Sequence, residues 1–505
     1  MLPYLLIFIA FWLAFSFSGE KWLSRTALLC LCLCGGYEAV LGLMQLAGFA
    51  VSGHPGYAMT GTFANPGPYG GFIAMPLAAG TVYLLERGGL LFKGKVADIV
   101  YDTVIFFSVF LCVIVLPATM SRAGWMGFIV AIALSLVRDG RIKRWISGRR
   151  WLLLAVAVVV VVCLTGIISL KHESALGRLH IWRIEARAIA SGSFFGSGPG
   201  TILGEYGKAQ EEFFREKERA DVAVQIAGCP EYPFNEYLGI GIEYGIPGLL
   251  MSLVIPAFAI WNLIRHRNAL GYALAALCVF AFFSYPMSLW PFRVCLALCL
   301  GAGFAIDPKI ESRKNVLRII VLSVSSVLLV LAAILLHRDI ESETAAERKW
   351  QDAKYWSTAG LYEDSAEGLI PLYDRLKGNY RYLYDLGYAL HKAERYAESN
   401  AVLEEGAKIS CDPMFHNIIG KNYEAVEDHA NAEKEYLKSH YMVPSRLYPL
   451  TLLMDMYIRQ GRTADAETVG KKIMSMSVNL RNLTMVRLRR ETEGRLDSLK
   501  MNEAL

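Results

Sequence analysis

The sequence predicts an all-α protein in two parts, a polytopic membrane helix bundle with a large external loop and then a soluble α-solenoid. The chain of 505 residues is 54% hydrophobic and only 19% charged, which is apolar for a soluble protein. Its first two thirds alternate apolar runs with short charged connections. Its last third lacks such runs and repeats at helical spacing. We therefore expect a membrane domain over residues 1–338 and a repeat domain over residues 339–505.

About ten apolar runs are candidate membrane spans, because a helix needs roughly 20 apolar residues to cross the hydrocarbon. The first run is followed directly by another and has no small-residue cleavage site, so we expect a span and not a removed signal peptide. The runs cover residues 1–17, 26–50, 69–85, 99–118, 124–137, 151–170, 235–264, 270–287, 294–306 and 316–336.

Lysines and arginines fall on alternate connections between these runs. Basic connections include Lys21 with Arg25, Arg87 with Lys95, and a cluster from Arg138 to Arg150. By the positive-inside rule these connections are cytoplasmic. The same alternation places the long loop of residues 171–234, and everything after residue 338, outside the cytoplasm.

The ten cysteines do not predict a metal site. Eight lie in apolar runs, where they are expected to be small buried hydrophobic residues. Only Cys229 and Cys411 lie in polar segments. These two could pair in an oxidising compartment, but the sequence does not decide whether they do.

The last third of the chain repeats with a period of about 34 residues. Tyr362 and Tyr396 are separated by this period, as are Ala353 and Gly387, and Gly420 and Met454 continue the series. Small residues at tight helix crossings and aromatic residues facing the next helix resemble tetratricopeptide repeats, over residues 343–480. Such solenoids bind peptides or proteins. The alternative is a set of unrelated amphipathic helices.

Arginines outside the cytoplasm are the first candidates for chemistry. Arg122 lies between two predicted spans, and Gly124 next to it permits close helix approach. The alternative is an arginine at the membrane interface. In the long loop, Arg178, Trp182 and Glu185 share one helix face.

Arg183 and Arg187 share a neighbouring face of the same predicted helix. Guanidinium groups match phosphate oxygens, so these arginines predict an anion site, against the alternative of a solvated amphipathic helix. Gly198, inside Gly196-Ser197-Gly198-Pro199-Gly200, would add backbone amides to such a site, although a plain glycine turn is the more ordinary interpretation. His180 is a candidate base or a surface group.

Polar residues at the start of the run at 235–264 and in the first external loop are further candidates. Asn235, Glu236 and Glu243 lie near the start of that run. A carboxylate there must face a polar interior or a partner, for which an arginine is the obvious choice. Glu38, inside the second run, has the same need. Asn65 either hydrogen-bonds a sugar or forms a structural turn.

Taken in order, the polar motifs between residues 61 and 250 resemble those of the O-antigen ligase and polymerase superfamily. They are Gly61-Thr62-Phe63-x-Asn65-Pro66, Ser121-Arg122-Ala123-Gly124-Trp125, Gly177-Arg178 with Trp182, Gly196-x-Gly198-Pro199-Gly200, Asn235-Glu236-Tyr237-Leu238, and Glu243-x-Gly245-Ile246-x-Gly248. The resemblance implies a glycosyltransferase of the bacterial inner membrane that takes a glycan from a polyprenyl diphosphate at the periplasmic face. The acceptor would be lipid A–core, a growing polysaccharide or a protein, and the repeat domain would be periplasmic.

The resemblance also implies roles for individual residues. Arg122 and Arg178 match arginines that the family uses around the donor diphosphate, and no metal or other cofactor is expected. Ligases and protein O-oligosaccharyltransferases have a histidine directly before the asparagine of the Asn-x-Tyr-Leu motif, where this chain has Phe234. Phenylalanine cannot accept a proton. The identity of the general base therefore stays open, and the candidates are Glu236, His180 and Glu231.

The branch within the superfamily stays open as well. The missing histidine favours a polymerase, whereas a peptide-binding repeat domain suits a protein acceptor or a partner in an assembly complex. A non-enzymatic membrane scaffold or transporter is the alternative from another class. It leaves the motif set unexplained, and the spans show no internal repeat.

Overall fold

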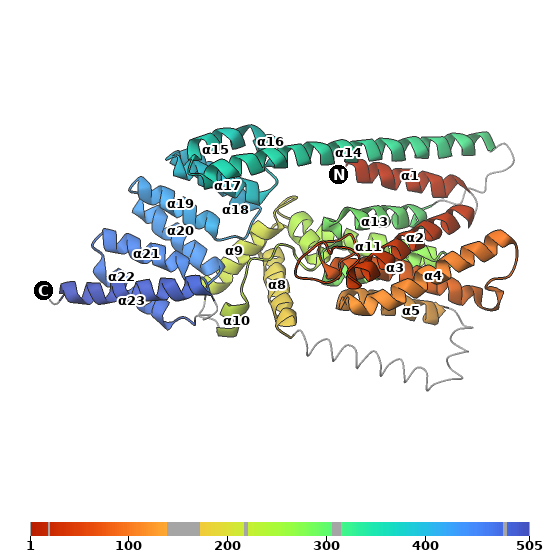
Figure 1. Ribbon diagram of the computed structural model, residues 1–505, viewed down its shortest axis with the longest axis horizontal. Helices are drawn as coiled ribbons and strands as arrows, with labels where there is room; N and C mark the ends of the chain where they lie inside the picture. Colours follow the sequence, from red (N-terminus) through yellow and green to blue (C-terminus); the bar gives the residue numbers. More distant parts are fainter. Residues whose placement is uncertain are drawn as a thin grey trace. The chain divides into compact units, whose positions relative to one another are not determined.

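The computed structural model describes residues 2–18, 21–138, 172–216, 221–305, 315–477 and 482–503, and all regular secondary structure in these ranges is helical (Figure 1). The chain forms two compact units. The first contains Met1–Ala175, Phe234–Tyr237 and Leu249–Arg338. The second contains Leu176–Pro233, Leu238–Gly248 and Asp339–Leu505. Most of the predicted external loop therefore belongs to the same compact unit as the C-terminal third of the chain.

The first unit is a bundle organised around α3. This helix contacts α2, α4, α5 and α12, and residues Pro68 to Gly80 are all buried. The helices are α1 (Leu2–Ser18), α2 (Lys21–Leu46), α3 (Pro66–Arg87), α4 (Val96–Ala118), α5 (Arg122–Arg138), α12 (Leu270–Phe283) and α13 (Trp290–Gly303), with parts of α11 (Glu236–Arg265) and α14 (Asn315–Thr358). Two short 3-10 turns, η1 (Gly88–Leu90) and η2 (Pro286–Ser288), also belong to the described part of this unit.

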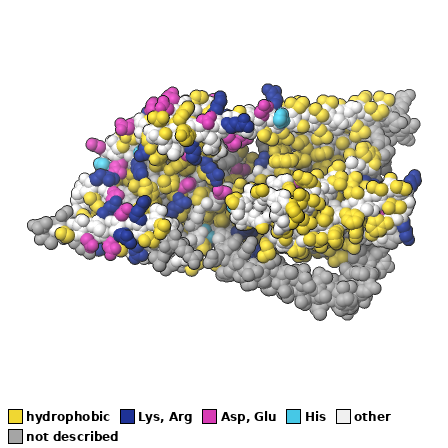
Figure 2. All heavy atoms as spheres, viewed as in Figure 1, with side chains coloured by type: hydrophobic (Ala, Val, Ile, Leu, Met, Phe, Trp, Pro, Cys, Tyr) yellow, Lys and Arg dark blue, Asp and Glu magenta, His cyan; other side chains and the backbone are white. Residues whose placement is uncertain are grey.

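Nine of the predicted spans fall on these helices, and the tenth, at residues 151–170, lies outside the described residues. Within the described ranges, α2, α3, α4, α11 and α14 are long and apolar enough to cross a membrane, and α1, α12 and α13 are shorter apolar helices. The total of about ten spans stays a prediction. Hydrophobic side chains make up much of the visible surface of this unit (Figure 2). Phe107, Val254 and Val327 are among its exposed side chains. A surface of this composition suits contact with lipid.

The second unit joins three loop helices to a series of helical hairpins. The loop supplies α8 (His172–Ser191), α9 (Ile202–Arg215) and α10 (Asp221–Ile226). The C-terminal third supplies α15 (Tyr362–Leu369), η3 (Ile370–Leu372), α16 (Tyr373–Leu376), α17 (Tyr380–Lys392), α18 (Tyr396–Lys408), α19 (Met414–Ala425), α20 (His429–Met442), α21 (Tyr448–Arg459), α22 (Thr463–Ser475) and α23 (Leu483–Glu503). Charged side chains are spread over the visible surface of this unit (Figure 2).

One turn geometry recurs along the hairpins. Gly360, Glu394, Glu427 and Gly461 all have positive φ angles, and they are 33 or 34 residues apart. After each of them, the next backbone N–H donates to the carbonyl five residues earlier, as Leu361 does to Trp356. This is the Schellman arrangement that ends a helix. The 34-residue period is thus present in the backbone, while the assignment to the tetratricopeptide class stays a prediction.

Cys229 and Cys411 are joined in a disulfide, with Cα atoms 5.4 Å apart. The bond links the segment after α10 to the segment between α18 and α19. Of the other described cysteines, Cys32 and Cys112 are buried as expected, but Cys30 and Cys34 are exposed on the surface of α2. The expectation of burial is wrong for these two, because they face away from the neighbouring helices. No cluster of metal-ligand side chains occurs among the described residues.

Candidate functional site

Arg122 is the first residue of α5 and follows a tight turn at the end of α4. Ser121 caps the helix, since its Oγ accepts the N–H of Gly124 at 3.3 Å and donates to the carbonyl of Gly67 at 3.1 Å. A Cβ on Gly124 would lie 2.6 Å from the carbonyl oxygen of Gly70, so this glycine lets α3 and α5 cross closely. The N-termini of α3 and α5 are therefore neighbours, and Arg122 adds its charge to two positive helix ends.

Arg122 is half-buried, and within the described part of the chain its guanidinium has no hydrogen-bond or ion-pair partner. An arginine that is partly desolvated and not neutralised by a carboxylate favours an anion as its ligand. The position agrees with the predicted role at the donor diphosphate, and with the alternative of an interfacial arginine.

Asn65 is the N-cap of α3. Its Oδ1 accepts the N–H of Gly67 at 2.8 Å, and Pro66 follows in the first turn. This geometry matches the structural alternative for Asn65. A single capping bond through the oxygen leaves the amide group able to donate, so a role in sugar binding stays a prediction.

The loop before Asn65 is anchored on α2 by two buried polar side chains. Glu38 accepts the backbone N–H and the hydroxyl of Thr62, at 3.0 and 2.6 Å. Gln45 Oε1 accepts the N–H groups of Thr60 and Gly61, and its Nε2 donates to the carbonyl of Gly61 at 2.8 Å. The partners that Glu38 needs inside the bundle are thus main-chain and hydroxyl groups of the loop.

The Asn235-Glu236-Tyr237 motif fixes the start of α11 within the first unit. Asn235 is buried, and its Oδ1 accepts the N–H of Tyr237 at 3.0 Å. Glu236 is 8% exposed, and its Oε1 accepts the N–H of Met287 at 2.7 Å. The hydroxyl of Tyr237 donates to the carbonyl of Cys278 at 3.0 Å. Asn235 therefore caps the start of α11, while Glu236 and Tyr237 hold this helix against the segment from α12 to η2.

Phe234 occupies the position where the resemblance places a histidine. Its backbone lies in the left-handed region, with φ of 54°. Its ring meets Tyr285 edge to face, with centroids 5.5 Å apart. A non-glycine residue in this conformation is uncommon and is retained where the surroundings impose it. The backbone at this position thus adopts an uncommon conformation, although the phenylalanine side chain cannot accept a proton.

The glycine motif after α8 docks on a break in α11. Gly245 interrupts the helix with φ of 64°. Ser197 and Gly198 donate their N–H groups to the carbonyls of Ile242 and Glu243, both at 3.0 Å. In return, Ile246 donates to the carbonyl of Phe194 at 3.0 Å. The two segments therefore satisfy each other's backbone groups at the break.

This docking corrects two expectations. The amides around Gly198 do not form an anion site, because Gly196, Ser197, Gly198 and Gly200 all use their N–H groups inside the protein, and Pro199 has none. Among the described residues, Glu243 has no arginine partner. Its Oε1 accepts the N–H of Gly200 at 2.6 Å instead. A plain structural turn, the more ordinary interpretation, is the better description of this motif.

The loop helix α8 presents a buried face to the rest of the second unit, and its arginines are exposed to different degrees. Ile184 and Glu185 are buried, Arg178 is half-buried and Arg183 is exposed. The guanidinium of Arg183 lies 5.0 Å from the ring centroid of Phe213 on α9. Arg187 pairs with Glu216. Arg183 and Arg187 thus help to hold α8 to the end of α9, which is a structural use of side chains expected to bind substrate.

His180 is poorly suited to the predicted role of a base. It is 6% exposed and packs against Phe213 and Phe214. Its Nε2 donates to Gln210 Oε1 at 3.1 Å, and burial lowers the pKa of the imidazole. A histidine with this environment cannot easily reach an acceptor hydroxyl. The structure therefore favours a packing role.

Gln210 was not singled out by the sequence, yet it connects four segments of the second unit. Its Oε1 accepts from His180 and from the hydroxyl of Tyr206 at 2.7 Å. Its Nε2 donates to the carbonyls of Gly228 and Met442, at 3.0 and 2.5 Å. A glutamine on the buried side of an amphipathic helix is the one signal that could have identified it.

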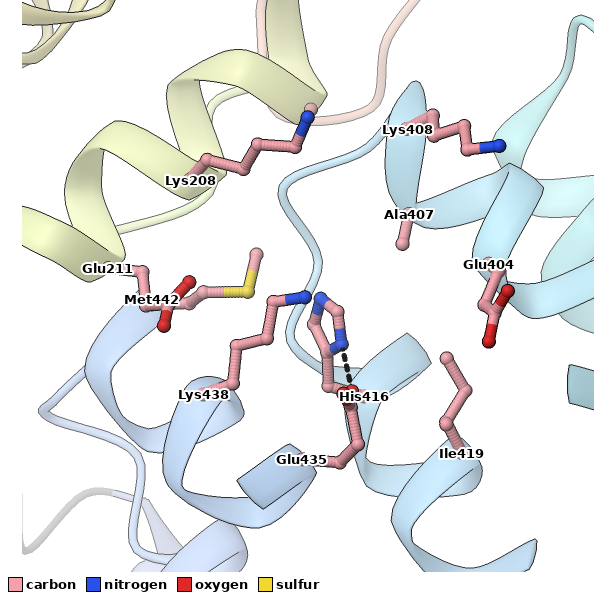
Figure 3. Close-up of a pocket in the computed structure, with 11 residues that line it drawn as sticks. Lys208, Glu211, Glu404, Ala407, Lys408, His416, Ile419, Glu435, Lys438 and Met442 are labelled. Carbon is pink, nitrogen blue, oxygen red and sulfur yellow. Dashed lines mark hydrogen bonds and ion pairs between the residues drawn. The ribbon is translucent and has the colours of Figure 1, made fainter. Parts of the chain in front are cut away.

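A polar cavity of about 260 Å³ lies between α9 and the hairpins, lined by side chains of α9, α18, α19 and α20 (Figure 3). His416 Nδ1 donates to Glu435 Oε2 at 2.6 Å within it. Burial alone would raise the pKa of Glu435, but this bond and the charge of His416 lower it on balance. Burial raises the pKa of Glu211 on the opposite wall. The cavity is thus a polar space within the second unit, and His416 and Glu435 are paired inside it.

The predicted site residues fall in both units. The first unit holds Asn65, Arg122, Asn235 and Glu236, and the structure brings the turn at Asn65 together with Arg122 through the bond between Gly67 and Ser121. The second unit holds Arg178, His180, Arg183, Gly198 and Glu243, of which Gly198 and Glu243 lie together.

Comparison with known families adds independent information. The model of the O-antigen ligase family matches residues 107–253. The matched segment contains Arg122, α8, the glycine motif and the first part of α11 with its break at Gly245. The match supports a ligase-like membrane glycosyltransferase. Comparisons with curated proteins and with solved structures gave no match.

Proposed function

We propose that this chain is a membrane glycosyltransferase that transfers a glycan from a polyprenyl diphosphate to an acceptor hydroxyl at the periplasmic face of a bacterial inner membrane. The observation that carries the proposal is the match of residues 107–253 to the O-antigen ligase family. The apolar surface of the first unit and the disulfide of the second are consistent with a membrane protein whose second unit lies in an oxidising compartment.

In the proposed reaction, the acceptor oxygen attacks the anomeric carbon and the bond from that carbon to the diphosphate oxygen breaks. The lipid diphosphate leaves as an anion, and a base takes the proton of the acceptor hydroxyl. Arg122 and Arg178 stabilise the charge that develops on the leaving diphosphate. Arg122 suits this role because it is partly desolvated and has no carboxylate partner in the described structure.

Glu236 is the candidate that we keep for the base. It is the only one of the three proposed carboxylate or imidazole groups that lies in the Asn-x-Tyr-Leu motif next to Phe234. Glu231 and His180 lie outside this motif, where Glu231 pairs with Arg381 at 2.5 Å and His180 is bound to Gln210, while Glu236 is bound to the N–H of Met287 through Oε1. Replacing Glu236 with glutamine retains an oxygen for the N–H of Met287 but removes the ability to accept a proton.

Transfer from a purified polyprenyl-diphosphate glycan, measured with the full-length protein, tests the proposal. Arg178→Ala should lower transfer by at least about a hundredfold, the scale seen when a group that stabilises transition-state charge is removed. Arg178→Lys should restore little transfer activity, because an ammonium group cannot reproduce the bidentate hydrogen bonds of a guanidinium group. Full activity of Arg178→Ala in membranes with normal protein levels would reject the assignment of this arginine.

The acceptor is tested by deleting the gene and staining lipopolysaccharide and glycoproteins for sugar. Loss of long or capped lipopolysaccharide alone indicates a ligase or polymerase, and loss of glycoprotein staining alone indicates a protein O-oligosaccharyltransferase. The disulfide and the ion pair between Glu231 and Arg381 attach the hairpins to the loop within the second unit. This attachment favours a hairpin domain that takes part in handling the substrate over one that only recruits partners.

A further inference from the structure

The hairpins have one side engaged by the loop and another that carries a cavity of its own. The loop helix α9 packs on α18 and α20, the second helices of their hairpins. A separate cavity of about 380 Å³ lies among the end of α14, α15 and α17. Its volume is within the range of roughly 300–1,000 Å³ typical of small-molecule sites. The proposed reaction does not use this cavity.

Three tyrosines form an aromatic corner in this cavity. Tyr384 and Tyr388 follow each other on one face of α17, with centroids 6.3 Å apart and ring planes only 13° from parallel. Tyr362 stands almost perpendicular to Tyr388, at 83° and 6.3 Å. Tyr384 and Tyr388 are each half-exposed. The two rings thus lie nearly parallel on one face of α17 with Tyr362 upright beside them, and Nζ of Lys392 lies 5.8 Å from the centroid of the Tyr388 ring.

The remaining lining is polar. Lys354 pairs with Asp385 at 3.1 Å, and the indole N–H of Trp350 donates to the same carboxylate at 3.0 Å. Ser357 and Thr358 add hydroxyl groups from the last turn of α14. Leu369 is the one aliphatic side chain among the described lining residues. The cavity therefore offers hydrogen-bond donors and acceptors beside its aromatic rings.

This combination selects a class of ligand. A pyranose ring has a flat face of C–H groups that packs on an aromatic ring, and a rim of hydroxyls that both donate and accept hydrogen bonds. An apolar peptide anchor would need an aliphatic pocket, which Leu369 alone does not form. An inorganic anion would meet the carboxylate of Asp385, and a cation would meet Lys354.

We propose that the cavity between α14, α15 and α17 binds one or two sugar residues of a glycan, with Tyr384 and Tyr388 as the stacking surface. The inference rests on the proposed function, because a glycan transferase is the setting in which such a site has a substrate to hold. It extends that function, since it makes the hairpin domain a glycan-binding module and not only a protein-binding one.

The test measures binding of a free oligosaccharide to the full-length protein in detergent. The probe is the oligosaccharide released by mild acid from the lipid-linked glycans of the source organism, followed by saturation-transfer NMR and titration. Tyr388→Ala should weaken binding about tenfold or more, as loss of an aromatic anchor does. Tyr388→Phe, which keeps the ring, should bind nearly as the parent does. Tyr373→Ala, a tyrosine outside the cavity, is the matched control.

A second variant guards against loss of folding in Tyr388→Ala. Thr358→Trp fills the cavity from an exposed position at the end of α14 and should also abolish binding. Absence of binding by the parent protein would overturn the inference, as would equal binding by the parent and both variants. If a serine- and threonine-rich peptide binds with this variant dependence and the oligosaccharide does not, the occupant is a peptide and the glycan inference is wrong.

The two proposals fail in different ways. Arg178→Ala should lose transfer but retain binding of the free oligosaccharide, because that arginine does not line the cavity. Binding that depends on Tyr388 in a protein without transferase activity would reject the proposed function and leave the glycan site standing. Transfer activity without Tyr388-dependent binding would reject the glycan site and leave the proposed function standing.

Discussion

The carboxylate of Glu243 accepts the backbone N–H of Gly200 at 2.6 Å, across the break that Gly245 makes in α11. This bond joins the end of the glycine motif to the last turn before the break. It gives a charged side chain near the start of an apolar helix a partner that is not a cation. Two motifs that are more than 40 residues apart in the sequence are thereby parts of one local structure.

Glu243 should accordingly tolerate loss of its charge better than loss of its oxygen. Glu243→Gln keeps an acceptor for Gly200 and should unfold within a degree or two of the parent, whereas Glu243→Ala should lose about 1–3 kcal/mol. Thermal unfolding of the purified protein measures both. If Glu243 instead binds substrate through its charge, Glu243→Gln will have normal stability and no transferase activity.

Two glycines with nearly the same φ angle should respond differently to alanine. Gly196 has φ of 84°, and an added Cβ would lie 2.3 Å from the carbonyl oxygen of Glu243. Gly200 has φ of 83° and open space around it. Gly200→Ala should therefore cost only the strain of the left-handed backbone, about 1–2 kcal/mol. Gly196→Ala should separate the loop from α11 and reduce the yield of folded protein. Similar melting temperatures for the two variants would contradict the docking described here.

Removing the disulfide should destabilise the second unit. Cys229 and Cys411 are 182 residues apart, and closing so long a loop restricts the unfolded chain strongly. The double variant Cys229→Ser/Cys411→Ser should lose roughly 2–5 kcal/mol of unfolding free energy. A reducing agent should lower the melting temperature of the parent and leave the double variant unchanged. Cys30→Ser, at a free and exposed cysteine, is the control and should behave as the parent.

The second unit should lose stability between pH 7 and pH 5 because of His440. Burial, with the nearby charge of Lys472, lowers the pKa of this imidazole to about 3. The folded state keeps it neutral, while the unfolded chain takes up a proton below its ordinary pKa of about 6.5. Stability therefore falls as the pH drops below 6.5, by up to about 1.4 kcal/mol per pH unit.

His440→Gln should make the unfolding free energy less dependent on pH in this interval. His180 and His391, whose pKa values burial also lowers, contribute in the same direction and leave a residual slope. Glu435, with a lowered pKa, loses its stabilising bond only at a more acidic pH. A slope that is identical in the parent and in His440→Gln between pH 7 and pH 5 would show that His440 is accessible to protons in the folded protein.

Patterns along the chain predicted the features that depend on composition and period. Apolar runs identified nine helices of the first unit, and small residues such as Gly387 and Gly420 identified the crossings of the hairpins, where they face Leu403 and Tyr436. The close approach at Gly124 was predicted for the same reason. In each case the side chain itself, or its absence, determines what the segment can pack against.

Sequence patterns could not predict the features that depend on hydrogen bonds to backbone groups. The sequence shows that Glu38 and Glu243 need partners, but Thr62 and Gly200 serve them through main-chain N–H groups that every residue has. Gln210 was missed because its role comes from four segments that meet only in the folded chain. The sequence left an anion site at Gly198 open beside a plain turn for the same reason, since it does not show where an amide points.

The bond between Cys229 and Cys411 also constrains how the chain threads through a membrane. Two cysteines can be oxidised to each other only if they emerge on the same side, so the polypeptide between them must cross the bilayer an even number of times. That interval contains α11, α12, α13 and α14. All four could cross, or two of them, but not three. A covalent link within the second unit thus decides whether the number of membrane crossings between its two cysteines is even or odd, and the link can close only after translation has passed residue 411.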